Sequence, residues 1–492
     1  MEKDFTKFRE EGSKYLSTWK IKKLRIYGRK MGVFRPTDRS KSNLIEQIIG
    51  IWTGEIEPIE PSKRGAPVKE KDLPPEIHQR MSELYDKYVK NEGVPYEEKR
   101  AHYLPPRINR LWEFNDPSAP RVEYVNGQQA VYKGQLYFYE GKYMLLPLNF
   151  MDGRQQYVER QVAEKYGLEE GDVVTFFGKY TENGIYATEI VTINDTAVEN
   201  FKRRIWDDLF PCYPFERIRF YNEETGEPQD NTAKYLQWLF PIGQGHRTCV
   251  FGAPKSGKST ILCKIAQYAR QYNNDLKVFV ALIDQAPEEV GKYRKFADKE
   301  NLVFASYEDE PERQIFLADF MLARAKAYAE SGKNALLILD SIGGLARAYN
   351  ETDESSGGKV LSCGLESKTL RYVKKFLGAG RCFEEGGSLT VVAALTTDTG
   401  SPIDDLLEKE TSEISNARIH LSNRLAISRI YPAIDYQKTE IKDCGLLQIS
   451  EEIELQKFIR NEYVPQDDEG RLFDRLEESH TYAQFKENVY KK

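Results

Sequence analysis

The sequence is poor in cysteine, and its few cysteines form no recognisable pattern. Six cysteines are spread over 492 residues, at positions 212, 249, 263, 363, 382 and 444, and no two have the C-x-x-C spacing typical of zinc sites. Disulfide frameworks belong mostly to short, cysteine-rich secreted chains. We therefore expect neither a zinc cluster nor a disulfide scaffold, and a reducing cytoplasm is the simplest expected location.

Long apolar runs are also lacking. No stretch approaches the roughly 18 residues needed to cross a bilayer, and the first residues, Met1-Glu2-Lys3, begin no apolar core of the signal-peptide type. An excess of positive charge is absent too, since the formal net charge is −6. We expect no membrane partner and no globally basic nucleic-acid binder, although a local basic groove is compatible with this balance.

The chain is too long for a single core, and its pattern changes along its length. Residues 1–52 read as a helical domain whose basic segment, 20–32, either touches nucleic acid or packs internally. Residues 53–118 begin as a linker rich in proline and charge and continue as a helical segment. Residues 119–197 contain short strands of period two separated by glycines, which predicts a small OB-type barrel.

From 205 to 492, near-continuous apolar strands alternate with helical segments. The predicted strands are 248–252, 277–284, 335–340 and 388–396. Strands of this kind are buried on both faces, so we expect a multidomain α/β protein whose last domain contains a parallel sheet.

The barrel segment is crowded with aromatic residues. Tyr137, Phe138 and Tyr139 are consecutive, and successive strand residues point to opposite faces, so all three cannot lie inside. Exposed rings on a small barrel commonly stack on single-stranded bases. Tyr137, Tyr139 and especially Tyr186 are our candidate base contacts. A core position is the alternative for each, because spacing does not fix which face is inside.

One motif fixes a ligand class. An apolar strand runs into Gly252-x4-Gly257-Lys258-Ser259, the phosphate-binding P-loop. Its backbone N–H groups and the N-terminus of the following helix attract phosphates. Lys258 is expected to reach the β- and γ-phosphates and Ser259 to bind Mg²⁺. The alternative, a chance match, is disfavoured by the strand before the motif and the helical segment after it. The candidate ATP-binding residues here are Gly252, Pro254, Lys255, Ser256, Gly257, Lys258, Ser259 and Thr260.

Two other strand ends belong to the same predicted site. The apolar strand 336–340 ends in Asp340, which we expect to hold Mg²⁺ through water, a helix cap being the alternative. The strand 278–285 ends at Gln285, where hydrolytic members of this architecture place a water-activating glutamate. Glutamine can orient water but cannot take its proton, and losing a general base typically costs 10²–10⁴-fold in rate.

At this point long segments resemble the family of the bacterial transcription termination factor Rho. The matching segments are 283–284 with 287–290, 314–318, 339–342, 345–350, 384–390 and 431–436. The resemblance covers about 205–450 clearly and the barrel more weakly, through 156–158 and 168–172. It implies a RecA-type motor in a hexameric ring, ATP and Mg²⁺ as cofactors and single-stranded RNA as partner, with RNA polymerase as a further candidate partner.

The resemblance also implies roles for individual residues. Tyr431 would stack on adenine, and Lys255 would join the phosphate cradle. The segment with Lys359, Val360 and Ser362 would be the pore loop that grips RNA. Without the resemblance it would be interpreted as a solvated turn. Arg429 is present as a candidate catalytic residue, together with Gln285 and Lys442.

The departures from the family lie where it has its catalytic groups. The family's arginine finger aligns with Lys442, a point charge without the planar fork of arginine, and such a finger is worth 10³–10⁵ in rate. Gln285 stands where the family has its catalytic glutamate, and Ala286 stands where the family has the arginine after it. Gly343-Gly344 replaces a Thr-Arg pair, and Pro402 replaces a second pore-loop lysine.

Two functions follow. We favour a termination factor that translocates on RNA by ATP hydrolysis, because the expected phosphate, metal and adenine contacts are all present. The alternative is a hydrolysis-impaired relative that acts as an ATP-stabilised RNA-binding ring or as a regulator of termination. A DNA recombinase or a rotary ATP synthase subunit shares only the motor fold and leaves the aromatic barrel unexplained.

Overall fold

The computed structural model describes residues 5–31, 33, 39–53, 55–56, 75–85, 127, 129–139, 142–148, 156–181, 184–222, 228, 230–352, 363–463 and 469–491. The chain divides into two compact units, Met1–His102 and Tyr103–Lys492. Residues 119–126 of the predicted barrel segment, the predicted pore-loop residues Lys359, Val360 and Ser362, and most of the predicted linker and helical segment 53–118 lie outside the described residues.

The described part of the first unit is helical. It contains α1 (Phe5–Ser17), α2 (Ile21–Met31), α3 (Lys41–Thr53) and α4 (Pro75–Tyr85). Leu24, Leu44, Ile48 and Met81 come from three of these helices and share one buried core. The predicted boundary at residue 52 therefore leaves out a helix, α4, that belongs to this core.

A closed barrel begins the described part of the second unit. Its strands are β1 (Gln129–Tyr139), β2 (Lys142–Pro147), β3 (Gln156–Tyr157), β4 (Val173–Thr181), β5 (Gly184–Ile193) and β6 (Thr196–Ala197). They lie in the order β3-β2-β1-β4-β5-β6, and β3 also pairs in parallel with β5, which closes the sheet. Helix α5 (Arg160–Tyr166) follows β3. This arrangement confirms the predicted OB-type barrel, hereafter the barrel (residues 129–197).

A large sheet forms the centre of the α/β part (residues 205–491). Its strands are β7 (Pro211–Cys212), β8 (Arg247–Gly252), β9 (Leu276–Gln285), β10 (Leu302–Ser306), β11 (Asn334–Asp340), β12 (Arg381–Phe383), β13 (Ser388–Thr396), β14 (Ala417–Leu421) and β15 (Glu440–Ile441). The order is β10-β9-β11-β13-β8-β14-β15, and all neighbours from β10 to β14 are parallel. The predicted parallel sheet is thus confirmed.

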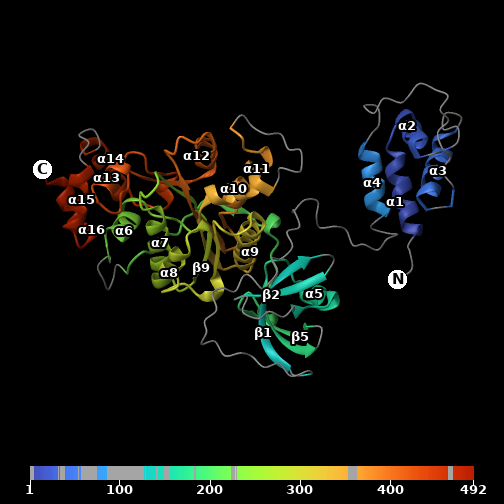
Figure 1. The fold of residues 1–492 in the computed structure, drawn as a ribbon, viewed down its shortest axis with the longest axis horizontal. Coiled ribbons are helices and arrows are strands. Elements are labelled where there is room, and N and C mark those ends of the chain that lie inside the picture. The colour runs from blue at the N-terminus through green and yellow to red at the C-terminus, as the bar shows by residue number, and fades with distance from the viewer. Residues whose placement is uncertain are drawn as a thin grey trace. The chain divides into compact units, whose positions relative to one another are not determined.

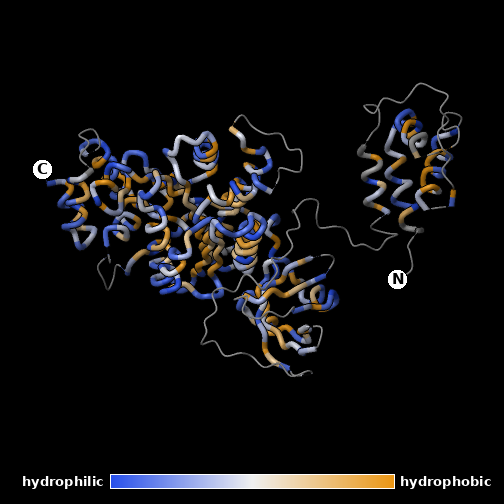
Figure 2. The backbone as a smooth tube through the Cα atoms, in the orientation of Figure 1, coloured by the Kyte–Doolittle hydropathy of each residue, from blue (hydrophilic) through white to orange (hydrophobic). Residues whose placement is uncertain are grey.

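Helices cover both faces of this sheet because its strands are apolar on both sides. Ile283 of β9 faces a core shared with α9, α10 and α11, whereas Leu282 faces a core shared with α7, α8 and the C-terminal helices. Figure 1 shows α7 and α8 on one side of β9 and α9 on the other. The apolar residues gather on the strands and on the helix surfaces turned toward them (Figure 2).

The helices of the α/β part are as follows. They are α6 (Asn231–Lys234), α7 (Lys258–Tyr272), α8 (Pro287–Tyr293), α9 (Pro311–Glu330), α10 (Ile342–Thr352), α11 (Ser367–Leu377), α12 (Pro402–Ile414), α13 (Asn423–Ile427), α14 (Ser450–Glu462), α15 (Glu469–Glu477) and α16 (Tyr482–Tyr490), with one π-helical turn, η7 (Tyr235–Leu239). Short 3₁₀ turns are η5 (Val198–Asn200), η6 (Trp206–Asp208), η8 (Lys299–Asn301) and η10 (Cys444–Leu446). Among the helices that the structure describes, none combines the length and the apolarity needed to pass through a bilayer.

The barrel contacts helix α9 through buried polar groups. Gln135 of β1 is 1% exposed; its Nε2 donates to the carbonyl oxygen of Phe320 over 2.8 Å, and its Oε1 accepts from Nε of Arg324 over 2.7 Å. Arg324, also 1% exposed, donates to the carbonyl oxygen of Glu300 as well. Burial lowers the pKa of the Arg324 guanidinium to about 9, against the opposing charges of Glu300 and Asp195.

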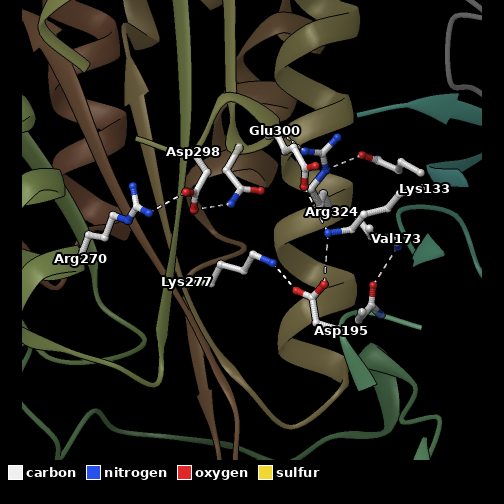
Figure 3. A network of polar contacts seen from close by, with 11 residues as sticks. Lys133, Val173, Asp195, Arg270, Lys277, Asp298, Glu300 and Arg324 are labelled. Atoms are coloured by element: carbon white, nitrogen blue, oxygen red, sulfur yellow. Dashed lines mark hydrogen bonds and ion pairs between the residues drawn. The ribbon is translucent and has the colours of Figure 1, made fainter. Parts of the chain in front are cut away.

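A series of charged side chains lies beside this contact (Figure 3). Asp195, from the turn after β5, pairs with Lys277 of β9 and lies 3.3 Å from Nζ of Lys133. Lys133 in turn donates to Oε2 of Glu300 over 3.1 Å. The side chains of these four residues are 25–46% exposed, so the buried charge here is that of Arg324. A buried charge is stable only when it is hydrogen-bonded, and the Gln135 partner of Arg324 comes from the barrel.

Candidate nucleotide-binding site

The P-loop leaves the sheet at the carboxyl end of β8 and enters helix α7. Gly257 has φ of +100°, a conformation that side chains rarely adopt, and it directly precedes the first residue of α7. A β-carbon placed on Gly252 would lie 2.5 Å from Oγ of Ser256, so the loop folds back closely on its own strand. The two glycines of the motif are therefore both required by the backbone, as a phosphate cradle needs.

Lys258 lies inside this loop. Its Nζ donates to the carbonyl oxygens of Gly252 and Ala253, each over 2.8 Å. Burial lowers the pKa of the ammonium to about 8, which the charge of Asp340 only partly offsets. Neutral carbonyls stabilise a buried cation less than an anion does, so this ammonium is suited to receive a phosphate.

Asp340 ends β11 at the same edge of the sheet. It is 3% exposed, and burial raises the pKa of its carboxyl, while a hydrogen bond with the Ser259 side chain acts in the opposite direction. Its Oδ2 atom has no hydrogen-bond partner among the described residues. A buried carboxylate oxygen left in this way, beside a serine hydroxyl at a helix N-terminus, fits a hydrated Mg²⁺ held between the two residues.

Tyr431 lies next to the phosphate loop. A β-carbon on Gly257 would come within 3.5 Å of Cε1 of the Tyr431 ring. The side chain is 48% exposed, and its hydroxyl donates to the carbonyl oxygen of Ala426 over 3.3 Å. A partly exposed ring held beside the loop has the placement needed to stack on a base.

Gln285 lies at the far end of β9. Asp340 pairs with Leu282 in the parallel register, so β9 continues three residues past the level of Asp340. The Gln285 amide is half-buried and donates only weakly, over 3.4 Å, to the carbonyl oxygen of Ile283. Its side chain is thus held by one long contact, and its amide can reorient.

The remaining predicted catalytic residues are exposed. Arg429 has φ of +59° and follows α13, and Lys442 directly follows the edge strand β15. Neither side chain makes a hydrogen bond or an ion pair with the P-loop residues that the structure describes in the same chain. Lys359, Val360 and Ser362 lie outside the described residues.

The barrel aromatics separate into two groups. Tyr137 is half-buried against α9, its ring centroid 5.5 Å from that of Phe316, and Tyr139 stacks on Tyr137. Tyr186, by contrast, stacks on Tyr157 with the centroids 5.4 Å apart, across the parallel β3–β5 pair that closes the barrel. The structure thus places Tyr137 at the junction with α9 and Tyr186 in a two-ring cluster on the barrel.

Three features of these sites were missed from the sequence. Tyr157 joins Tyr186 only because the barrel closes through β3 and β5. Exposed Lys179 pairs directly with Tyr186 in the antiparallel register and adds a positive charge beside the rings. Arg347 of α10 donates to Oδ2 of Asp284 over 3.0 Å, one residue before Gln285. No short motif marks these contacts. Tyr157 with Tyr186 and Asp284 with Arg347 are far apart in the sequence, and the position of Lys179 depends on the register of the β4–β5 pair.

Comparisons with known proteins agree with this geometry. Residues 232–439 match the nucleotide-binding domain of the ATP synthase alpha/beta family. Transcription termination factor Rho of Haemophilus influenzae is 33% identical over 339 residues, 67% of this chain and 79% of the relative. Rho of Escherichia coli K12 is 34% identical over 309 residues, 62% of this chain and 73% of the relative.

A third relative and a solved structure are also similar to this chain. Rho of Pseudomonas aeruginosa is 31% identical over 345 residues, covering 68% of this chain and 81% of the relative. A solved ATPase of a bacterial type III secretion system is similar with a TM-score of 0.47 and 20% identity, over 58% of this chain and 88% of that one.

Proposed function

The chain belongs to the family of the transcription termination factor Rho, and on that premise we propose that it is an RNA-dependent ATPase of this family. It binds ATP with Mg²⁺, forms a ring of six copies, holds single-stranded RNA on its barrel and moves along it to release transcripts from RNA polymerase. A cytoplasmic location is part of this proposal.

The observation that supports this most directly concerns two charged groups at the P-loop, neither of which forms an ion pair with a described residue. Lys258 contacts only neutral carbonyls, and Oδ2 of Asp340 has no partner in the described part of the chain. Lys258 would bind the β- and γ-phosphates, and Ser259 and Asp340 would hold Mg²⁺. The bound ion would neutralise the phosphate charge that develops during hydrolysis. Tyr431 would hold the adenine, so the base, the β- and γ-phosphates and the metal ion each have a candidate contact.

Hydrolysis in this proposal is slow. Gln285 would orient the attacking water without taking its proton, as a glutamine does in small GTPases. Arg429 and Lys442 are exposed and would complete the site of a neighbouring copy in the ring. A lysine supplies charge without bidentate geometry, so we expect only part of the rate that an arginine finger provides.

RNA binding rests on the barrel. The stacked pair Tyr157 and Tyr186, with exposed Lys179 beside it, combines aromatic surface and positive charge, which single-stranded nucleic acid requires. Tyr139 stacks on Tyr137 at the edge of the junction with α9 and would extend that surface. Lys359, Val360 and Ser362 remain our proposed pore contacts.

The second candidate function is a ring that binds ATP and RNA but scarcely hydrolyses ATP. Gln285 at the water-activating position and Lys442 at the finger position favour it. Such a protein would act as an ATP-stabilised clamp on RNA or as a regulator of termination.

Phosphate release separates the two. Wild type, Gln285→Glu and Lys258→Ala are compared with and without poly(C), after ATP binding has been verified for the first two. An active motor gives RNA-stimulated release in the wild type well above that of Lys258→Ala. A binding ring gives wild-type phosphate release at the Lys258→Ala level. In that case Gln285→Glu raises the rate of release by about 10²-fold or more. Failure of the wild type to bind ATP would contradict both.

A further inference from the structure

Two of the six cysteines lie directly opposite each other on neighbouring strands. Cys212 of β7 pairs with Cys382 of β12 in the antiparallel register. Residues that face each other in such a pair have Cα atoms about 4.5–5.5 Å apart. Disulfides span Cα separations of about 4.4–6.8 Å. The two strands therefore hold the cysteines at a separation that a disulfide can bridge without movement of the backbone.

The two side chains also meet. Opposite residues of an antiparallel pair project their side chains to the same face of the sheet. The two thiols are close enough to form a hydrogen bond, and both are free in the structure. Strand register and thiol contact thus agree that the two sulfur atoms are neighbours.

The two thiols differ in their access to solvent. Cys382 is 8% exposed, and its burial raises the pKa of its thiol to about 12, with the neighbouring Cys212 thiol acting in the same direction. Cys212 is half-buried, and Phe210 and Tyr213 on either side of β7 are each 67% exposed, so an oxidant reaches the Cys212 sulfur first. An accessible thiol beside a second thiol that can resolve it is the arrangement found at redox-sensing cysteines.

The pair lies where the chain passes from the barrel to the central sheet. Strand β7 is two residues long and follows the connector (residues 198–210). At Arg203 the connector forms an ion pair with Asp172 of the barrel. Strand β12 pairs on its other side with β13 of the central sheet. A covalent bond between Cys212 and Cys382 would therefore join the end of the connector to that sheet.

We propose that Cys212 and Cys382 form a reversible oxidation site whose disulfide fixes the connector to the central sheet. Disulfides in reducing compartments are usually transient and often sense oxidants, so this site needs no oxidising location. Neither cysteine belongs to the nucleotide site or to the proposed RNA contacts. The inference therefore goes beyond the proposed function and does not depend on it.

The oxidant is a hydroperoxide, with hydrogen peroxide as the simplest case. The Cys212 thiolate attacks one peroxide oxygen, so that an S–O bond forms, the O–O bond breaks and the other oxygen takes up a proton and leaves as water. The Cys382 thiol then loses its proton and attacks the Cys212 sulfur. The S–S bond forms, the S–O bond breaks and a second water leaves, so the two thiols have given two electrons to one peroxide.

Peptide mapping tests the bond directly. The reduced full-length protein is treated with a small excess of hydrogen peroxide, and the remaining thiols are alkylated. Trypsin then releases residues 205–217 and 382–409, each with one cysteine. We expect these two peptides to be joined, in a chain that still migrates as a monomer on a non-reducing gel, and dithiothreitol should separate them again. A bond between two copies, a bond of Cys212 to a different cysteine, or no bond at all would overturn the inference.

Single variants test the roles of the two thiols. In Cys382→Ser the oxidised Cys212 has no partner, so dimedone, which labels sulfenic acids, should modify it. In Cys212→Ser the buried Cys382 should stay unlabelled, and equal labelling in the two variants would contradict the assigned order. Cys444→Ser removes another half-buried cysteine and is the matched control, which should form the bond as the wild type does. Mapping of the wild type needs no variant, so it decides the question even where Cys382→Ser folds poorly.

Hydrogen exchange tests the consequence of the bond. A disulfide that closes a long loop stabilises the elements that it joins. The amide hydrogens of residues 206–212 should exchange at least about tenfold more slowly in the oxidised wild type than in the reduced one. In Cys212→Ser, peroxide treatment should leave their exchange unchanged. Equal exchange in the oxidised and reduced wild type would show that the bond does not fix the connector, against the proposal.

Discussion

The ring of Tyr431 lies beside Gly257, so close that a β-carbon on the glycine would be 3.5 Å from the ring. The same tyrosine is 48% exposed, so part of its surface is open beside the phosphate cradle. Base stacking and phosphate binding are thus assigned to different residues of one site, and they can be tested separately.

We expect Tyr431→Ala to weaken ATP binding by about tenfold, because an aromatic stack contributes about 0.5–1.5 kcal/mol beyond the area it buries. Tyr431→Phe keeps the ring and should bind ATP nearly as the wild type does. Inorganic tripolyphosphate, which has no base, should bind all three proteins equally in calorimetry. Equal loss of ATP and tripolyphosphate binding in Tyr431→Ala would mean that the ring supports the loop and does not stack on adenine.

Nucleotide binding should weaken at alkaline pH because of Lys258. The pKa of its ammonium is lowered to about 8 in the free protein. Binding of phosphates requires the charged form and raises its pKa, so affinity is full below pH 8 and is lost as pH rises above it. The dissociation constant for ATP should increase about tenfold between pH 8.5 and 9.5. Lys258→Arg stays charged over this range and serves as the control; an equal slope in that variant would assign the effect to another group.

We expect Tyr157→Ala with Tyr186→Ala to weaken binding of a fluorescent oligo(C) by at least tenfold in an anisotropy titration, since stacking contributes about 1–3 kcal/mol per base. Lys179→Ala should weaken RNA binding modestly. It should also reduce the slope of log affinity against log salt concentration by about one. Tyr137→Ala with Tyr139→Ala is the comparison. In the wild type the Tyr137 ring packs on Phe316, so we expect this second double variant to be less stable and to lose less RNA affinity than the first. The reverse order of the two double variants would place the RNA site at the junction with α9.

Arg324→Leu should destabilise the protein by about 3 kcal/mol. It leaves Oε1 of buried Gln135 and the carbonyl oxygen of Glu300 without their donor, and a buried group left unpaired costs about 1–3 kcal/mol. Urea unfolding at neutral pH measures the change. Arg160→Ala, which breaks an exposed pair with Glu164 on α5, should stay within about 0.5 kcal/mol. A similar small change in Arg324→Leu would mean that the junction relaxes around the loss.

The features that were predictable from the sequence are local and periodic. The run from Thr248 to Ser259 contains a strand, a loop and a helix start in consecutive residues, so its structure follows from spacing alone. The strand ends at Asp340 and Gln285 were located in the same way, because buried parallel strands are near-continuous apolar runs. The barrel was indicated by short period-two strands separated by glycines, although residues 129–139, which include Gly134, prove to be the single strand β1.

The features that the sequence did not reveal depend on contacts across long separations. Tyr157 looks like any strand aromatic until β3 pairs with β5. Alternation alone could not tell that Tyr137 meets Phe316, because that contact depends on how α9 is placed against the barrel. Gly343 and Gly344 stood out only as departures from the family pattern. Their structural reason, the approach of Asp284 and Arg347, requires the packing of β9 on α10.

The bond between Gln135 and Arg324 also has a consequence for how such chains diverge. A gene fusion that replaced the barrel with an unrelated RNA-binding module would leave a buried guanidinium in α9 facing a foreign surface. Recombination at the segment between residues 197 and 205 is therefore disfavoured, and the barrel and helix α9 should be inherited as one block. Substitutions at 135 and 324 are expected to accompany one another among related chains.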